Sequence, residues 1–320
     1  MKILEKFQSL VLLMAIVIGM LLGNIPIIES YAENLVTPFL FVMLFGVFLN
    51  TPLKDFKKAL GNVKFSIATV LINFVWTPII VILLGKMFLV DSPIMQIGFL
   101  MLMVTPCTDW YLVFTGIAKG NVPLSATVLP VNLILQIVLL PVYLYIAGGV
   151  TGSVNMHELL FSVLYMLIVP FVLAQIAKVF IQKLKYDKMK EKIFNVFSSL
   201  QIVLLALAIM AMFASKGNSL LSNLNIVAKL IIPILLFYII NFVLAHVIGK
   251  VFKYTYEDTA SLTLTTIAKN SPMTLGIALM AFPNEPIIHL IMLVEPLIEL
   301  PVMTMIARFL LLLRNKNKTQ

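Results

Sequence analysis

The sequence has little charge: only 12% of its 320 residues are Asp, Glu, Lys or Arg, whereas 61% are hydrophobic. Soluble domains are about 45–50% apolar and about 25% charged, so the composition excludes a soluble globular domain and predicts an all-α integral membrane protein. A single cysteine excludes an intramolecular disulfide. The sequence also lacks His/Cys ligand spacings, phosphate-binding glycine loops and nucleophile motifs, so we expect no enzyme, no cofactor and no resident metal.

The net charge is positive, +9, which on its own would suit a nucleic-acid partner. The lysines and arginines are concentrated in short stretches between long apolar segments, and this distribution is typical of a membrane surface. We therefore expect the lipid bilayer as a partner and no nucleic acid.

Long apolar segments recur along the whole chain, and about 20 apolar residues are enough for a helix to cross a bilayer. We predict ten transmembrane helices, of which the second is short and the tenth is long. In chain order they are residues 8–24, 35–51, 63–89, 94–117, 122–147, 157–182, 194–214, 227–252, 259–281 and 286–312. Because the connections are short, we predict a single transmembrane transporter domain over residues 1–320.

The basic residues also predict an orientation. With ten spans, 18 lysines and arginines fall on one side of the membrane and three fall on the other. Because cytoplasmic loops carry the excess of positive charge, we expect a multi-pass protein of the plasma membrane with both termini in the cytoplasm.

A basic loop in the middle of the chain divides the ten spans into two halves of five, approximately residues 1–150 and 151–320. An odd number of spans in each half forces the halves into opposite orientations, so any homology between them is an inverted repeat. A shift of 163 positions places Gln136 on Glu299 and matches the interrupted fourth span to the interrupted ninth. We therefore predict two inverted five-helix repeats with broken helices four and nine that cross.

Two charges lie inside apolar spans, Asp109 in the fourth and Lys269 in the ninth. A charge at bilayer depth costs about 2.5–3.5 kcal/mol on insertion scales. Each lies beside a proline, Pro106 or Pro272, that interrupts the helix, and broken helices with midplane charges form the sites of many secondary transporters. We expect the two charges to pair. The plainer alternatives are a proline kink without a ligand and a purely structural ion pair.

The residues around these charges form a candidate substrate site. Its members are Cys107, Thr108, Asp109, Lys269, Asn270 and Ser271. A cysteine thiolate is the softest ligand a protein offers, so a soft metalloid is a chemically sensible substrate. The alternative for Cys107 is a small buried hydrophobe, as most lone cysteines are.

The tenth span carries Glu295 and Glu299, which are four residues apart and therefore share a helix face. Two carboxylates in a low dielectric do not both ionise at low cost, and a group that gains and loses a proton is what proton coupling requires. We expect Glu299 to carry the proton; in one alternative only Glu299 is deep and Glu295 lies near the interface. The candidate ion-coupling residues are Glu295, Glu299, Asp109, Asn132 and Gln136.

Three motifs resemble one known family. The run TPCTDWYLVFTGIAKGN (105–121) resembles the fourth-span signature of the arsenical-resistance-3 type arsenite efflux permeases. EPLIELPV (295–302) resembles the signature of their last span, and AKNSPMTLGIALMAF (268–282) resembles their ninth span. The likeness follows the span order over the whole chain. It implies membership of the bile acid:sodium symporter superfamily, whose fold is ten helices in two inverted repeats of five with crossing broken helices.

The resemblance also implies residue roles. The functional cysteine and glutamate of the arsenite permeases match Cys107 and Glu299. Asp109 and Lys269 depart from the family pattern, which has a small neutral residue at the first position and a small or amide residue at the second. A lysine ammonium in the place of a sodium ion disfavours sodium coupling and favours protons.

Together these observations predict a secondary active transporter, first of all a proton-coupled efflux permease for arsenite or a related metalloid. The alternative in the same class is a cation-coupled symporter of a small organic anion, held by Lys269 and helix N-termini. A non-transporting membrane receptor is the alternative of a different class, disfavoured because no soluble signalling domain is present. The expected partners are a metalloid or small-molecule substrate and H⁺, with Na⁺ as the second choice.

Overall fold

A computed structural model describes residues 8–50, 62–108, 110–149, 157, 161–162, 164–183, 186–282 and 284–318. The elements in this part of the chain are helices. They form two compact units, and each unit combines segments from the first and the second half of the chain.

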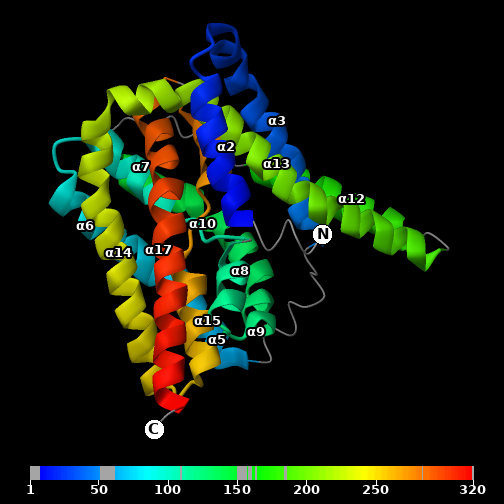
Figure 1. The fold of residues 1–320 in the computed structure, drawn as a ribbon, viewed down its shortest axis with the longest axis vertical. Coiled ribbons are helices and arrows are strands. Elements are labelled where there is room, and N and C mark those ends of the chain that lie inside the picture. The colour runs from blue at the N-terminus through cyan, green and yellow to red at the C-terminus, as the bar shows by residue number, and fades with distance from the viewer. Residues whose placement is uncertain are drawn as a thin grey trace. The chain divides into compact units, whose positions relative to one another are not determined.

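The first unit comprises Met1–Thr51, Val154–Asn225 and Pro272–Leu293. Its helices are α2 (Gln8–Leu22), α3 (Pro26–Asn50), the π-helical turn η4 (Leu164–Ile168), α12 (Val169–Gln182) and α13 (Asp187–Ser222), with most of α16 (Ser271–Ala281) and the start of α17 (Pro286–Lys318). The long helix α13 packs along α3 and α2, and α12 packs along α3 (Figure 1).

The contact between α2 and α13 depends on two glycines, Gly19 and Gly23. A Cβ atom at Gly23 would lie 2.6 Å from the carbonyl oxygen of Ala214 on α13, so no larger residue fits without moving a helix. Small residues allow this close backbone approach in membrane proteins. The side chain of Asn218 uses the proximity and donates a 2.9 Å hydrogen bond to the Gly23 carbonyl.

The second unit comprises Pro52–Ser153, Ile226–Ser271 and Val294–Gln320. Its helices are α5 (Val63–Leu71), the π-helical turn η3 (Ile72–Trp76), α6 (Thr77–Phe88), α7 (Pro93–Met103), α8 (Trp110–Ile117), α9 (Val122–Thr127), α10 (Leu129–Gly149), most of α14 (Leu224–Val251), α15 (Tyr256–Ile267) and the rest of α17. In this unit α15 packs against α8, α9 and α5, while α7 packs against α6 and α10. Figure 1 shows α15 beside α8 and α9.

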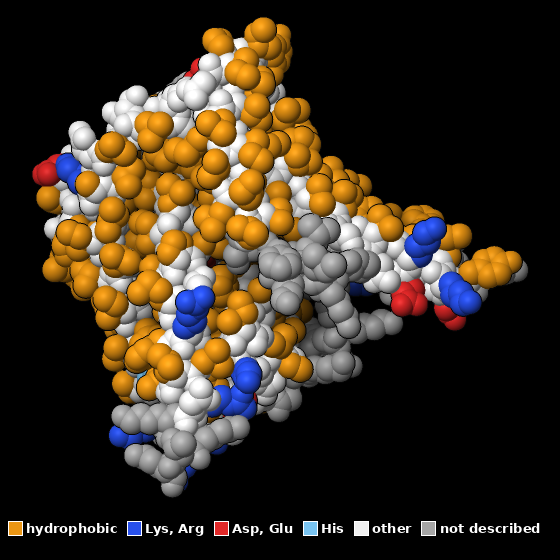
Figure 2. All heavy atoms as spheres, viewed as in Figure 1, with side chains coloured by type: hydrophobic (Ala, Val, Ile, Leu, Met, Phe, Trp, Pro, Cys, Tyr) orange, Lys and Arg blue, Asp and Glu red, His pale blue; other side chains and the backbone are white. Residues whose placement is uncertain are grey.

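Seven helices in the described residues are long and apolar enough to cross a membrane. They are Pro26–Asn50, Val63–Phe88, Val122–Ile146, Leu164–Gln182, Asp187–Ser222, Leu224–Val251 and Pro286–Asn315. Figure 2 shows hydrophobic side chains over most of the face in view and few charged ones. Large apolar side chains such as Ile27 and Met305 are 72% and 69% exposed, which fits a surface covered by lipid. The protein is therefore a multi-pass membrane protein.

The second predicted span, residues 35–51, begins too late. Helix α3 starts at Pro26 and has 25 residues, because the polar residues in its first turns lower the hydropathy without ending the helix. One of them, Glu33, accepts a 2.8 Å hydrogen bond from Lys216 on α13 and is thereby kept in the packed helix.

The predicted interruptions of the fourth and ninth spans are confirmed. Helix α7 ends at Met103 and α8 begins at Trp110, while α15 ends at Ile267 and α16 begins at Ser271. Each broken span therefore consists of two short helices joined by an irregular segment, and this geometry positions the candidate site.

Candidate functional site

The two irregular segments meet inside the second unit and pair like short antiparallel strands. Pro106 lies opposite Lys269 in an isolated bridge. The Cys107 amide donates to the Ala268 carbonyl at 3.1 Å, and the Asn270 amide donates to the Thr105 carbonyl at 3.0 Å. Backbone groups freed by a broken helix are expensive to leave unpaired at membrane depth. Each break therefore supplies the hydrogen-bond partners that the other lacks.

Lys269 occupies the centre of this crossing and its side chain is only 2% exposed. Its Nζ donates to the carbonyl of Thr266 at 3.1 Å and lies 4.8 Å from the ring centroid of Phe237. A cation at this place is favourable, because the C-terminal turn of α15 carries the negative end of the helix dipole and the aromatic face attracts the ammonium.

Glu295 and Glu299 are both buried, at 0% and 1% exposure, so Glu295 does not lie at the interface. Their carboxyl groups lie beside each other, as their shared helix face predicts. Glu299 Oε1 accepts a 2.8 Å hydrogen bond from the backbone amide of Lys269. Glu295 Oε1 accepts a 3.1 Å hydrogen bond from the hydroxyl of Tyr238 on α14. Glu299 thus binds the irregular segment between α15 and α16, and Glu295 binds α14.

The remaining predicted substrate residues of this crossing are also buried. Cys107 Sγ accepts a 3.3 Å hydrogen bond from the Trp110 amide at the start of α8. The Asn270 side chain donates to the Thr108 hydroxyl at 3.1 Å and so links the two breaks a second time. The Ser271 hydroxyl lies beside the Glu295 carboxyl. The structure therefore brings five of the six predicted substrate residues into one cluster.

The sixth, Asp109, lies outside the described residues, so its pairing with Lys269 stays a prediction. Asn132 and Gln136 lie on α10 in the same unit and are 2% and 1% exposed. The amide of Asn132 has no hydrogen-bond partner among the described residues. Their part in ion coupling also stays a prediction.

Two residues of the cluster were missed, Phe237 and Tyr238. They come from α14, which the sequence identifies only as an apolar span with no helix break and no charge near its middle. Two signals were present in the sequence: Pro233 lies inside this span one turn before Phe237, and Tyr238 and Asn241 lie three residues apart on one face.

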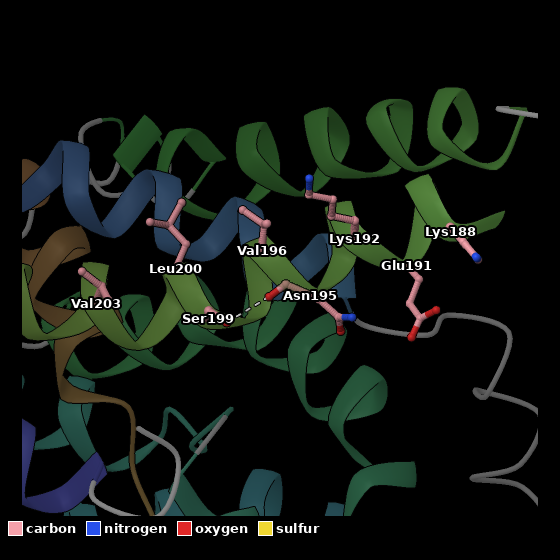
Figure 3. Close-up of a pocket in the computed structure, with 8 residues that line it drawn as sticks. All are labelled: Lys188, Glu191, Lys192, Asn195, Val196, Ser199, Leu200 and Val203. Atoms are coloured by element: carbon pink, nitrogen blue, oxygen red, sulfur yellow. Dashed lines mark hydrogen bonds between the residues drawn. The ribbon is translucent and has the colours of Figure 1, made fainter. Parts of the chain in front are cut away.

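A hollow of about 590 Å³ lies along α13 in the first unit. Figure 3 shows its lining residues on successive turns of this one helix. They are Lys188, Glu191, Lys192, Asn195, Val196, Ser199, Leu200 and Val203. None of the predicted site residues is among them.

Comparison with known proteins identifies the family. Residues 37–223, more than half of the chain, match the family model described as the Sodium Bile acid symporter family. The chain belongs to this family. The predicted resemblance is thereby confirmed, and the matched region includes the first of the three motifs, residues 105–121.

Individual relatives cover much of the chain at low identity. The chain is 24% identical to the uncharacterized transporter slr0944 of Synechocystis, over 96% of this chain and 88% of that protein. It is 21% identical to the arsenical-resistance protein Acr3 of Corynebacterium glutamicum, over 73% of this chain and 66% of that protein. It is 22% identical to the uncharacterized sodium-dependent transporter YocS of Bacillus subtilis, over 82% and 79%. The protein is therefore a membrane transporter.

Proposed function

We propose that this protein is a proton-coupled secondary transporter that exports arsenite or a related metalloid across the plasma membrane. The observation that carries the proposal is the buried cluster at the crossing of the two helix breaks. It combines a thiol, an ammonium and two carboxyls, from Cys107, Lys269, Glu295 and Glu299. A buried cluster of this kind suits a soft substrate and a titrating acid in one place.

Cys107 is the substrate ligand in this proposal. Its thiol is held at the N-terminus of α8 by the Trp110 amide, and a helix N-terminus favours the thiolate that binds a metalloid. The similarity to an arsenical-resistance protein supports the same substrate class.

Protons rather than sodium ions are the proposed coupling species. The ammonium of Lys269 already places one positive charge against the Thr266 carbonyl and the Phe237 ring, which leaves less need for a bound metal cation. The acidic pair of α17 supplies groups that can take up and release a proton. Asp109, Asn132 and Gln136 remain further candidates for this coupling.

The proposed transport cycle uses ten spans in two inverted repeats, with both termini in the cytoplasm. Three of the ten are the shorter helix α2 and the two broken spans, which join the seven long helices. Each compact unit contains segments of both halves of the chain, as expected if the halves are repeats whose corresponding parts pack together.

A second candidate is cation-coupled symport of a small organic anion. Lys269 favours it, because a buried ammonium beside the polar side chains of Thr108 and Asn270 can bind a carboxylate. The similarity to YocS, which is named a sodium-dependent transporter, supports the same reading.

Uptake into everted membrane vesicles separates the two candidates. Arsenite, antimonite and small carboxylates are compared in the parent protein and in Cys107→Ser, which keeps the size of the side chain but removes the soft donor. We expect arsenite uptake in the parent and its loss in Cys107→Ser at equal expression. Unchanged arsenite uptake in Cys107→Ser, or uptake of carboxylates alone, would favour the organic-anion transporter.

A further inference from the structure

Within the proposed proton-coupled function, on which this inference rests, the geometry points to Glu295 as the residue that bears the transported proton, with Tyr238 as its positioning residue. Glu299, the glutamate that matches the family motif, has a different role: it accepts a hydrogen bond from the backbone of the irregular segment between α15 and α16. The two carboxyls are close together and equally buried, so the assignment depends on their hydrogen bonds.

Glu299 is committed to the backbone. Its Oε1 accepts the Lys269 amide at 2.8 Å, and this amide lies in the irregular segment between α15 and α16, where no helical acceptor is available. Loss of the acceptor would leave a buried backbone donor unpaired, which is unfavourable in the low dielectric of the protein interior. A glutamine keeps an acceptor oxygen at this position, so Glu299→Gln preserves the contact.

Glu295 has one oxygen bound and one unbound. Its Oε1 accepts the Tyr238 hydroxyl at 3.1 Å. Its Oε2 has no hydrogen-bond partner among the described residues, and the Ser271 hydroxyl lies beside the carboxyl. Ser271 Oγ can accept a hydrogen bond from Oε2 when the carboxyl is protonated, and its hydroxyl can donate to Oε2 when the carboxyl is ionised, so the same neighbour serves both states. Glu295 can therefore gain and lose a proton at Oε2 without breaking the hydrogen bond that Oε1 accepts from Tyr238.

The charge of the cluster also calls for one proton. The groups facing Glu295 are Tyr238 from α14, Lys269 and Ser271 from the α15–α16 break, Glu299 from its own helix, and more distantly Cys107 from the α7–α8 break. Lys269 balances one ionised glutamate. The negative charge of the second glutamate is neutralised when its carboxylate takes a proton from water on one side of the membrane. The carboxylate becomes negative again when it releases that proton to water on the other side.

Tyr238 donates its hydroxyl to Glu295 Oε1 and so fixes the orientation of the acid. Its neighbour Phe237 lies under the ammonium of Lys269, 4.8 Å from ring centroid to Nζ, so two successive residues of α14 contact the acid and the cation. The ring of Tyr238 is itself buried, at 1% exposure, so the hydroxyl has a defined position from which to donate.

The test is infrared difference spectroscopy of the purified protein in lipid during a pH change, without substrate. A carboxyl group that gains a proton produces a C=O stretching band, and the readout does not depend on flux or on substrate identity. We expect the parent to show a band that is lost in Glu295→Gln and retained in Glu299→Gln. In Tyr238→Phe, which keeps the ring, we expect the band at a shifted frequency, because the carboxyl loses the hydroxyl that donates to its Oε1.

Loss of the band in Glu299→Gln with retention in Glu295→Gln would place the proton on Glu299 and overturn the inference, as would an equal reduction in both variants. An unchanged band in Tyr238→Phe would remove Tyr238 from the assignment. If Glu295→Gln does not fold, Glu295→Asp is measured instead. This variant keeps a carboxyl, and the inference requires its C=O band to lie at a different frequency from that of the parent. Failure of pH-driven flux with these spectra intact would instead contradict the proposed function alone.

Discussion

Replacing Lys269 with methionine removes the cation from the centre of the buried cluster while keeping a long, flexible side chain. The ammonium now donates to the Thr266 carbonyl at 3.1 Å and lies 4.8 Å from the Phe237 ring centroid. Two buried carboxyls, those of Glu295 and Glu299, lie near it. The substitution therefore leaves buried acidic groups without their compensating charge.

The expected loss is large. Leaving a buried charge without its compensating charge costs about 3–5 kcal/mol, and a desolvated contact between a cation and an aromatic ring alone contributes about 2 kcal/mol. We expect Lys269→Met to lower the free energy of unfolding by about 3–5 kcal/mol. The matched control is Lys250→Met, because Lys250 is exposed at the end of α14 and such surface changes stay within about 0.5 kcal/mol.

The assay is denaturant unfolding of each purified variant in mild detergent, followed by tryptophan fluorescence. The double variant Lys269→Met with Glu299→Gln should be less destabilised than the sum of its single changes, because it removes a positive and a negative charge together. A loss no greater than that of Lys250→Met, or additive losses in the double variant, would refute the role of Lys269 as the compensating cation.

Further predictions concern other parts of the chain. Asp109→Asn and Lys269→Met should be non-additive in a double-mutant cycle on folding yield and flux if the two charges pair; additive losses would show that they do not. Gly23→Ala should destabilise the protein by about 1–3 kcal/mol through overpacking against α13, measured by thermal unfolding. Gly116→Ala is its control, since the nearest atom to an added Cβ is 3.8 Å away, and equal effects of the two would contradict the packing argument.

Much of the site was predictable because breaks and charges inside apolar spans are rare and have a physical consequence. Pro106 and Pro272 marked the two interruptions, and backbone pairing between the interruptions brought their neighbours together. The spacing of Glu295 and Glu299 on one helix face also predicted that their carboxyls meet.

The contribution of α14 was not predictable from the same reasoning. Phe237 and Tyr238 lie in an unbroken apolar run, where an aromatic residue reads as lipid-facing or packing. Only the tertiary arrangement shows that one ring lies under Lys269 and that the other hydroxyl donates to Glu295. Likewise, the early start of α3 at Pro26 depends on its packing against α13, which hydropathy over a window does not report.

The measurement that tests the account most directly is flux in everted vesicles under two separate gradients. Arsenite uptake is followed with a pH gradient and no sodium, and then with a sodium gradient at equal pH on both sides. The account predicts uptake driven by the pH gradient alone and none driven by sodium. Uptake that requires sodium, or that does not respond to the pH gradient, would contradict it.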